Sequence, residues 1–125
     1  MTVRCPFCDD LSGSMTLDDS VVFAIRDRYP VTTGHTLIIS KRHVETWFDL
    51  DRNERIAVLD AIETVKAELD REFSPDGYNV GFNAGRAAGQ TVMHMHVHVI
   101  PRYNDDVDDP RGGVRGVIPS KQKYE

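Results

Sequence analysis

The chain has 125 residues, of which 40% are hydrophobic and 28% are charged, and these proportions are ordinary for a folded globular protein. Its formal net charge of −5 at pH 7 offers no overall attraction for nucleic acid, so we expect no nucleic-acid partner. No apolar run approaches the roughly 18 residues of a membrane span, and the N-terminus does not resemble a signal peptide, so we expect a cytoplasmic protein without a membrane partner.

Two strands and one long helix are predicted in the first part of the chain. Residues 21–26 are apolar and β-branched, and residues 35–40 repeat this pattern, so the two segments predict a hairpin. Asp51 and Glu54 have the spacing of a helix start, and the apolar residues that follow recur every three or four positions. We expect a helix that ends at residues 74–77 and packs on the core through Ile56, Leu59, Ile62, Val65, Leu69 and Phe73.

Two further strands, residues 78–83 and 93–101, are predicted on either side of a glycine-rich turn and should form a second hairpin. Residues 104–125 are rich in acidic residues, glycine and proline, which predicts an irregular tail. Because strands outnumber helices, the predicted fold class is α+β with an antiparallel sheet. We expect one domain over residues 1–125, with its core at residues 5–103.

Three of the five histidines alternate with apolar residues between positions 93 and 100. Because alternate side chains of a strand point to one face, we expect His94, His96 and His98 to form a stripe. The opposite face should carry Met95, Val97 and Val99. Imidazole nitrogens need polar partners, so such a stripe indicates a functional site rather than a core.

Cys5 and Cys8 have the Cys-x-x-Cys spacing that a tetrahedral zinc ion accepts. A closed structural site needs two more ligands, and a Cys₂His₂ set could take two of the histidines at positions 35, 43, 94 and 98. Spacing alone does not choose among them. The alternative is a redox pair, but no helix is predicted after Cys8, as a thioredoxin-like motif would require.

The histidine stripe is compatible with two kinds of catalytic site. The three imidazoles could hold a catalytic metal, as in zinc hydrolases with three histidine ligands. Alternatively, one imidazole could act as a nucleophile toward phosphorus. The glycine-rich segment 83–91 leads directly into the stripe, and its backbone N–H groups could approach a phosphate closely. A non-catalytic module that binds nucleotide or metal is the remaining interpretation.

Residues 89–102 contain the pattern His-φ-His-φ-His-φ-φ, in which φ is apolar, and resemble the signature of the histidine triad (HIT) family. Residues 34–43 resemble a second block of that family, and the order of elements agrees from Cys5 to about Tyr103. The resemblance is to zinc-bearing microbial members. It implies a HIT-like α+β unit with about five antiparallel strands, one long helix and a short one. It also implies that the sheet extends across a homodimer.

The resemblance further implies nucleotide chemistry. By match, His96 is the nucleophile that attacks an α-phosphate, His98 donates to the phosphate or the bridging oxygen, and His94 orients His96. The implied nucleotide contacts are Asp27 on the ribose and Asn83, Gly89, Gln90, Thr91 and His98 on the phosphate or leaving group. Weaker candidates for the base pocket are Leu11, Phe23 and Ile25. The implied ligands of a structural zinc are Cys5, Cys8, His43 and His94.

The branch of the family is less well defined. Gly89-Gln90-Thr91 and residues 100–103 resemble the diadenosine polyphosphate hydrolases, whereas phosphoramidase-type members usually carry serine near Thr91. The former have glutamine where this chain has Asn83, so the match is partial. We therefore expect a hydrolase or transferase that releases a nucleoside monophosphate from a dinucleoside polyphosphate or a nucleoside phosphoramidate.

The tail from residue 109 to 116 also resembles microbial members of the family. Arg111 and Arg115 in this segment could reach a second phosphate or the dimer mate. Alternatively, the two arginines balance the acidic run at residues 105–109.

Overall fold

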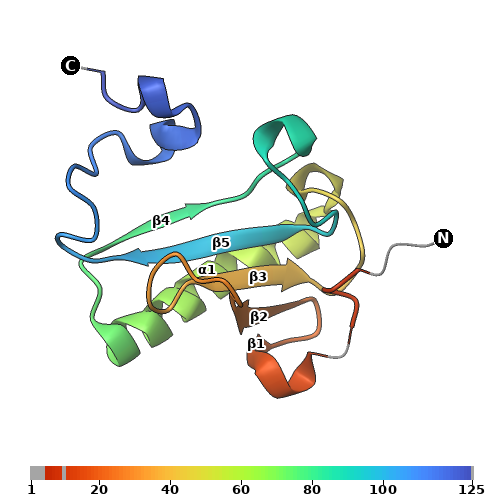
Figure 1. Cartoon of the computed structure of the whole chain (residues 1–125). Helices are drawn as coiled ribbons and strands as arrows, with labels where there is room; N and C mark the ends of the chain where they lie inside the picture. Colours follow the sequence, from red (N-terminus) through yellow and green to blue (C-terminus); the bar gives the residue numbers. More distant parts are fainter. Residues whose placement is uncertain (1–4, 10, 125) are drawn as a thin grey trace.

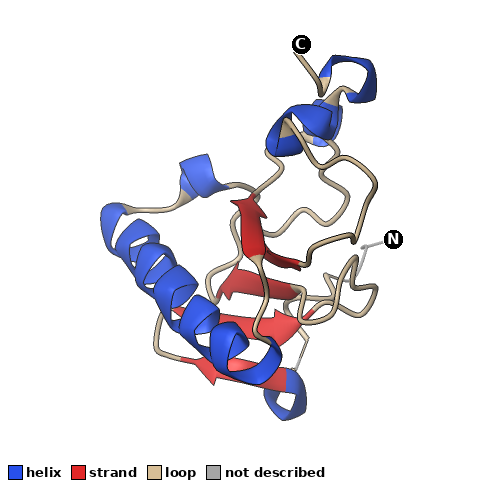
Figure 2. Ribbon diagram, turned by 90° about the vertical axis from the view of Figure 1, so that its left-hand side faces the viewer, coloured by secondary structure: helices blue, strands red, loops and turns tan. Residues whose placement is uncertain are grey.

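The computed structural model describes residues 5–9 and 11–124, and its five-stranded sheet is covered on one face by a long helix (Figures 1 and 2). All neighbouring strands are antiparallel, in the order β1-β2-β3-β5-β4. The strands are β1 (Met15–Asp18), β2 (Val22–Arg26), β3 (Thr36–Ser40), β4 (Gly77–Gly81) and β5 (His96–Arg102). The predicted α+β class is confirmed, as are the two hairpins β2–β3 and β4–β5.

The helix α1 (Arg52–Phe73) begins and ends where the sequence predicts. The Asp51 carboxylate accepts a hydrogen bond of 2.9 Å from the N–H of Glu54, and the Glu54 carboxylate accepts one of 2.9 Å from the N–H of Asp51. This reciprocal pair satisfies N–H groups that a helix start would leave without partners. The helix stops at Ser74, whose φ of 48° lies in the left-handed region.

The buried face of α1 differs in part from the predicted stripe. Leu69 is buried as expected, but Ile56 and Leu59 are 44% and 54% exposed, so their predicted place in the core is wrong. The buried positions are Glu54, Val58, Ala61, Val65 and Leu69. Glu54 favours this rotation, because its carboxylate binds both the helix start and the guanidinium of Arg42. An α-helix has 3.6 residues per turn, so positions 58 and 61 lie on the same face as Glu54. These positions therefore face the sheet in place of 56 and 59.

Both faces of the sheet are packed. On the helix side, Met95, Val97 and Val99 join the core, so the apolar residues that alternate with the histidines face inward as predicted. On the opposite face lies a second apolar cluster, which contains Phe23, Ile25, Leu37 and Ile39. In the β3–β5 register His98 pairs with Leu37 and His96 with Ile39. Directly paired residues share a face, so these two histidines stand beside the second cluster.

The first histidine of the stripe does not lie on the strand. Strand β5 begins at His96, and His94 occupies a bend just before it. The N–H of Met95 donates to the carbonyl of Val44 at 2.7 Å, so this part of the chain bonds to the segment after β3 instead of joining the sheet ladder. The predicted stripe of three equivalent histidines on one strand is therefore wrong for His94.

Two smaller differences concern the short elements. Strand β1, which none of the sequence patterns located, pairs with β2 at the sheet edge through a register that shifts between Met15 and Leu17. The expected short second helix is represented by brief 3-10 turns, and α1 is the one α-helix among the described residues. The turns are η1 (Ser12–Ser14), η2 (Trp47–Asp49), η3 (Arg86–Ala88), η4 (Gly113–Val117) and η5 (Pro119–Lys121).

Within residues 5–9 and 11–124, the helices are too short or too polar to cross a membrane.

The revised helix face can be tested by two matched truncations. Leu69→Ala should lower the free energy of unfolding by about 2–5 kcal/mol, because it opens a cavity in the core. Ile56→Ala on the outer face of the same helix should cost less than about 1 kcal/mol. Urea unfolding followed by circular dichroism measures both changes, and equal costs would contradict the observed rotation of α1.

Candidate active site and metal centre

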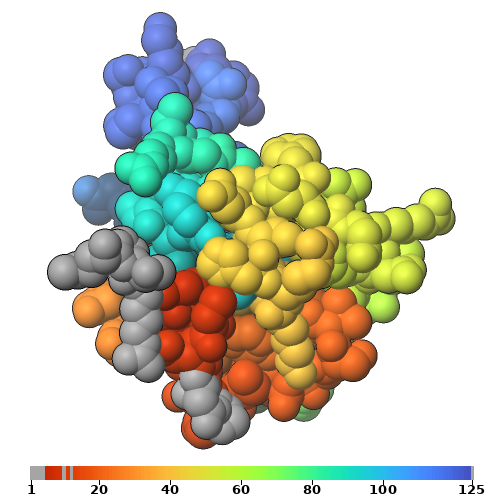
Figure 3. Space-filling view, turned by 90° about the vertical axis from the view of Figure 1, so that its right-hand side faces the viewer, coloured from red at the N-terminus to blue at the C-terminus, as the bar shows by residue number. Residues whose placement is uncertain are grey.

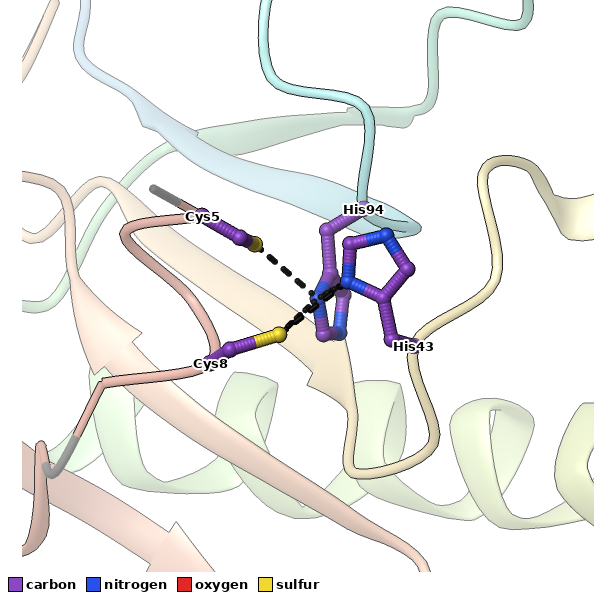
Figure 4. Close-up of side chains that lie close together, drawn as sticks. All are labelled: Cys5, Cys8, His43 and His94. Atoms are coloured by element: carbon purple, nitrogen blue, oxygen red, sulfur yellow. Dashed lines mark hydrogen bonds between the residues drawn. The ribbon is translucent and has the colours of Figure 1, made fainter. Parts of the chain in front are cut away.

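Two cysteines and two histidines from three separate segments meet at one point (Figure 4). Cys5 and Cys8 come from the N-terminal segment, His43 follows β3, and His94 precedes β5. The Nδ1 atom of His94 lies 3.4 Å from the sulfur of Cys5 and 3.1 Å from Nδ1 of His43. The sulfur of Cys8 lies 3.1 Å from Nδ1 of His43. Spacing in the sequence is compatible with several histidines, and the structure brings His43 and His94 to the cysteines.

The orientation of the His94 ring is determined by its other nitrogen. Nε2 lies 2.7 Å from the carbonyl oxygen of Ser40, so Nε2 carries the hydrogen and donates it. The lone pair of Nδ1 then points toward the two sulfurs. Burial lowers the pKa of His94, although the bond to Ser40 acts in the opposite direction. A neutral ring with a free lone pair is the form that binds a metal ion.

The four donor atoms fit a single tetrahedral metal ion. In a tetrahedral site, ligand bonds of about 2.0–2.1 Å to nitrogen and 2.3 Å to sulfur would hold two nitrogens, or a nitrogen and a sulfur, about 3.3–3.6 Å apart. The measured separations, from 3.1 to 3.5 Å, are close to this range. All four donors lie within 4.8 Å of one another. Two thiolates and two imidazoles are the donor set of closed structural zinc sites.

His96 belongs to a different environment on the same stretch of chain. Its Nδ1 lies 2.7 Å from the backbone carbonyl oxygen of His94, to which it donates a hydrogen bond. Because Nδ1 carries the hydrogen, Nε2 keeps its lone pair. The ring contacts Phe7 edge to face, with centroids 5.1 Å apart, and contacts His98 at 5.2 Å. His96 is therefore a restricted ring whose neutral form has a defined tautomer, with the lone pair on Nε2.

His98 is linked to a histidine that the sequence analysis treated only as a possible metal ligand. The N–H of Val31 donates to Nδ1 of His35 at 3.1 Å, which leaves the hydrogen of the buried His35 on Nε2. That Nε2 lies 2.9 Å from Nδ1 of His98 and donates to it. The remaining hydrogen of His98 is consequently on Nε2. A chain of two hydrogen bonds thus turns His98 into a donor toward the site.

Asp27 completes this second group, with Oδ2 at 3.5 Å from Nε2 of His35. Asp27, His35 and His98 could by position hold a metal ion. However, Nε2 of His35 carries a hydrogen as long as Nδ1 accepts the Val31 N–H, so it has no lone pair for a metal. Of the triad histidines, His94 belongs to the cysteine group and His98 to this group, whereas His96 belongs to neither. The arrangement therefore does not favour a metal held by all three.

The pKa values of this group are lowered chiefly by burial. Burial and the neighbouring imidazoles of His96 and His35 lower the pKa of His98 to about 4, although the Asp27 carboxylate opposes the shift. Burial also lowers the pKa of His35, again against the carboxylate of Asp27. Both rings are consequently neutral at pH 7, as the hydrogen-bond chain requires.

The loop before β5 is held by a buried amide. The Gln90 side chain accepts from the N–H of Gly85 at 2.8 Å and donates to the carbonyls of Glu45 at 2.7 Å and Val92 at 3.1 Å. Gln90 thus fixes the loop from within, and its predicted contact with phosphate stays a prediction. Gly89 has a φ of 94°, a conformation that favours glycine.

The other predicted nucleotide contacts lie around the same face. Asn83, Gly89 and Thr91 are exposed on the loop, which leaves β4 at Gly81, the register partner of His98. Leu11 packs against the second apolar cluster, and this cluster contains the two candidate base-pocket residues Phe23 and Ile25. The tail arginines have partners elsewhere: Arg111 pairs with Asp109, and Arg115 donates to the carbonyls of Lys121 and Gln122.

Residues 10–105 match the family model described as HIT domain. An uncharacterized HIT-like protein of Mycoplasma genitalium is 36% identical over 106 residues, which cover 82% of this chain and 75% of that protein. The crystal structure of a HIT family protein from Bacillus anthracis matches with a TM-score of 0.78 and 35% identity, over 85% of this chain and 78% of that one. The chain therefore belongs to the histidine triad (HIT) family.

Three further similar proteins have a bound metal or a named activity. A zinc-bound histidine triad family protein from Mycobacterium smegmatis matches with a TM-score of 0.75 and 33% identity, over 82% of this chain and 78% of that one. An adenylylsulfatase of Arabidopsis thaliana is 30% identical over 106 residues, 82% of this chain and 54% of that protein. A bis(5'-nucleosyl)-tetraphosphatase of Schizosaccharomyces pombe is 36% identical over 80 residues, 64% of this chain and 44% of that protein.

The low pKa of His98 has a measurable effect on stability. The unfolded chain protonates this ring near pH 6.5, but the folded chain does so only near pH 4. The unfolded state therefore binds more protons between these values, so the free energy of unfolding should fall as the pH is lowered from 6.5 to 4. His98→Gln should reduce this slope in urea unfolding. An unchanged slope, or an NMR titration of His98 near pH 6.5, would contradict the neutral donor.

Proposed function

We propose that the protein is a nucleotide hydrolase or transferase that attacks the α-phosphate of a nucleotide conjugate through His96. The observation that carries the proposal is the pairing of a free Nε2 lone pair on His96 with a neighbouring donor on His98. The adenylylsulfatase and the tetraphosphatase among the relatives support an enzyme that acts on nucleotides. The substrate is a dinucleoside polyphosphate or a nucleoside phosphoramidate, and a product is a nucleoside monophosphate.

In the first step Nε2 of His96 forms a bond to the α-phosphorus, and the bond from phosphorus to the leaving group breaks. The leaving group departs with the electron pair, and the ring becomes a cationic nucleotidyl-histidine. The carbonyl of His94 accepts the Nδ1–H of His96 and stabilises the positive charge. A water molecule or another acceptor then attacks phosphorus, its proton passes to solvent, and the P–N electron pair returns to Nε2.

His98 acts in this scheme by donating a hydrogen bond rather than by losing its proton. Its Nδ1 already accepts the hydrogen of His35, so removal of the Nε2 hydrogen would leave an anionic ring. The donor faces the phosphate or the bridging oxygen, where negative charge develops. A polyphosphate leaving group departs as an anion and needs no proton, whereas the nitrogen of a phosphoramidate takes a proton from solvent and leaves as the neutral amine. His35, held by Val31 and Asp27, acts as a positioning residue for His98.

The substrate contacts in the proposal follow the loop and the end of β2. Gly89 and Thr91 offer groups that can bind phosphate oxygens from the exposed loop, together with Asn83. Asp27 accepts the ribose hydroxyls, and the adjacent apolar cluster receives the base. A module that binds nucleotide without turnover is the alternative, and it would use these contacts without the His96 step.

The nucleophile can be tested by removing its nitrogen lone pair. His96→Asn should lower kcat by at least about a thousandfold, because no covalent intermediate can form, while nucleotide binding is largely kept. Release of nucleoside monophosphate from adenosine phosphoramidate and from diadenosine tetraphosphate measures turnover, and calorimetry measures binding. Full activity in the variant would exclude this mechanism. No product from either substrate with the unmodified protein would favour the binding module.

The proposal includes a structural zinc ion on Cys5, Cys8, His43 and His94. Bound there, zinc would cross-link the N-terminal segment to the ends of β3 and β5 through four protein ligands and leave no open position for chemistry. The fit of the donor set and the zinc-bound relative support this assignment. His94 thereby orients His96 through its backbone, while its side chain serves the metal.

Metal content provides a direct test of this centre. The purified protein should contain about one zinc ion per chain, and Cys8→Ser and His43→Ala should lower both the zinc content and the melting temperature. His35→Gln is the matched control, because it removes a histidine of the second group and should leave the zinc in place. A stable, active protein without metal would refute the site.

The proposal also places the enzyme in a homodimer. Strand β4 lies at one end of the sheet order, so its outer edge has backbone groups that pair with no other strand of the described chain. At this edge, Val80 of β4 and Phe82 just after it expose apolar surface, and Phe82 stacks on Trp47. Antiparallel pairing of two β4 strands about a twofold axis would continue the sheet and cover these side chains.

A further inference from the structure

The two cysteines lie at the ends of one tight turn at the surface of the molecule. The N–H of Cys8 donates to the carbonyl of Cys5 at 3.2 Å, and residues 6 and 7 form the turn between them. Cys8 is exposed and Cys5 is half-buried. The space-filling view shows the N-terminal segment, in red, at the surface beside the segment after β3, in yellow (Figure 3). A small molecule from solvent can therefore reach the pair.

The same turn brings the two sulfurs within range of a disulfide bond. The Cα atoms at the ends of a β-turn lie less than about 7 Å apart, and a disulfide spans about 4.4–6.8 Å between such atoms. The sulfurs of Cys5 and Cys8 lie within 4.8 Å of each other. The chain contains two cysteines in all, so a disulfide within it has to join these two residues.

The two sulfurs also join the N-terminal segment to the ends of the sheet. Cys5 lies 3.4 Å from Nδ1 of His94, and Cys8 lies 3.1 Å from Nδ1 of His43. A metal ion on these donors would make the contacts a cross-link, but the sulfur ligand of a metal is a thiolate. A bond between the sulfurs would therefore remove two of the four ligands. The same two atoms can hold either the metal or each other.

Phe7, which lies between the two cysteines, links this turn to the proposed nucleotide site. Its ring meets the rings of His94 and His96 edge to face, with centroids 5.9 and 5.1 Å apart. Phe7 and Leu11 also pack against the second apolar cluster, which the proposed function assigns to the base. The segment that carries the cysteines thus forms part of the wall around the proposed nucleophile and the base. Release of the sulfurs from their histidines would loosen that wall.

We propose that Cys5 and Cys8 form a redox switch, in which a hydroperoxide or another two-electron thiol oxidant joins them in a disulfide, releases the metal ion and weakens nucleotide binding. The inference rests on the structural zinc and the nucleotide site of the proposed function, and it adds a regulation of both. It does not depend on whether His96 is the nucleophile. Reduction of the disulfide in the presence of zinc restores the closed site.

The oxidation proceeds in two steps with hydrogen peroxide. The thiolate of Cys8, the more exposed residue, attacks one peroxide oxygen, so an S–O bond forms, the O–O bond breaks and hydroxide leaves. The thiolate of Cys5 then attacks the sulfur of Cys8, an S–S bond forms, and the S–O bond breaks to release a second hydroxide. Each hydroxide takes a proton from solvent and becomes water. The two sulfurs together lose two electrons, which reduce the peroxide.

The test treats the full, zinc-loaded chain with hydrogen peroxide. A chromogenic chelator should detect about one zinc ion released per chain, and the mass of the unfolded protein should fall by two hydrogen atoms. Calorimetry should show that adenosine monophosphate binds at least about tenfold more weakly, and dithiothreitol with added zinc should restore the binding. Diamide oxidises thiols without adding oxygen, so the same results with diamide would exclude oxidation of the four methionines as the cause.

Two controls separate loss of the metal from formation of the disulfide. Removal of zinc from the reduced protein by a chelator should weaken nucleotide binding to the same extent, because the wall is released in both cases. Cys5→His offers zinc an imidazole in place of a thiolate and leaves Cys8 without a partner, so this variant should keep its zinc in diamide. The chelator comparison needs no substitution and stays decisive if the variant does not fold.

The outcomes separate the switch from the proposed function. If the purified protein contains no zinc, the metal centre fails and the switch fails with it, whereas the His96 mechanism is decided by its own test. If zinc is present but the oxidants neither release it nor form the disulfide, the switch is wrong and the zinc centre stands. If the disulfide forms and zinc leaves while nucleotide binding is unchanged, the link through Phe7 is wrong.

Discussion

One hydrogen bond, from Nε2–H of the buried His94 to the carbonyl of Ser40, determines how the histidines divide their work. It directs the Nδ1 lone pair of His94 to the cysteines, so this ring belongs to the Cys₂His₂ cluster. The backbone carbonyl of the same residue accepts the hydrogen on Nδ1 of His96, which places the lone pair of the neutral ring on Nε2. Without the bond to Ser40, either nitrogen of His94 could carry the hydrogen, and the lone pair that faces the cysteines would have no fixed position.

The packed sheet holds the residues that form these hydrogen bonds in fixed positions. Strand β3 is buried on both faces, and it lies between β2 and β5, so the strand that carries His96 and His98 is braced by packed neighbours. Val97 and Val99 of β5 pack in the core on the helix side of the sheet. On the other side, Leu37 and Ile39 lie beside His98 and His96. Because packed interiors deform little, hydrogen-bond partners on adjacent strands keep their distances. The position of the site on a rigid element favours a catalytic role over a loosely held binding surface.

Sequence patterns predicted the features that depend on residues close together in the chain. They failed for features that depend on contacts between distant segments. Asp51 and Glu54, which form the helix cap, lie three positions apart, so the cap could be predicted from the sequence. The rotation of α1 instead depends on the ion pair between Glu54 and Arg42, which comes from another segment. Ile56 and Leu59 were therefore placed wrongly in the core. Spacing alone could not choose the metal ligands, because His94 lies 89 positions from Cys5; only the family resemblance selected the set that the structure brings together. The part of His35 was missed since it depends on a backbone N–H and on a partner across the sheet. The available sign in the sequence was a histidine at the first position of the predicted strand 35–40.

The link between Val31 and His35 has a consequence for how this sequence can change. The Val31 side chain is 67% exposed and makes no demand on the core, so many residues could replace it. Its N–H, however, sets the tautomer of His35 and through it that of His98. Proline has no N–H, so it is the one replacement that would remove the hydrogen bond which selects the tautomer of His35. A residue whose side chain can vary freely can thus be required for its backbone N–H. A comparison of side chains among related sequences would not detect this requirement.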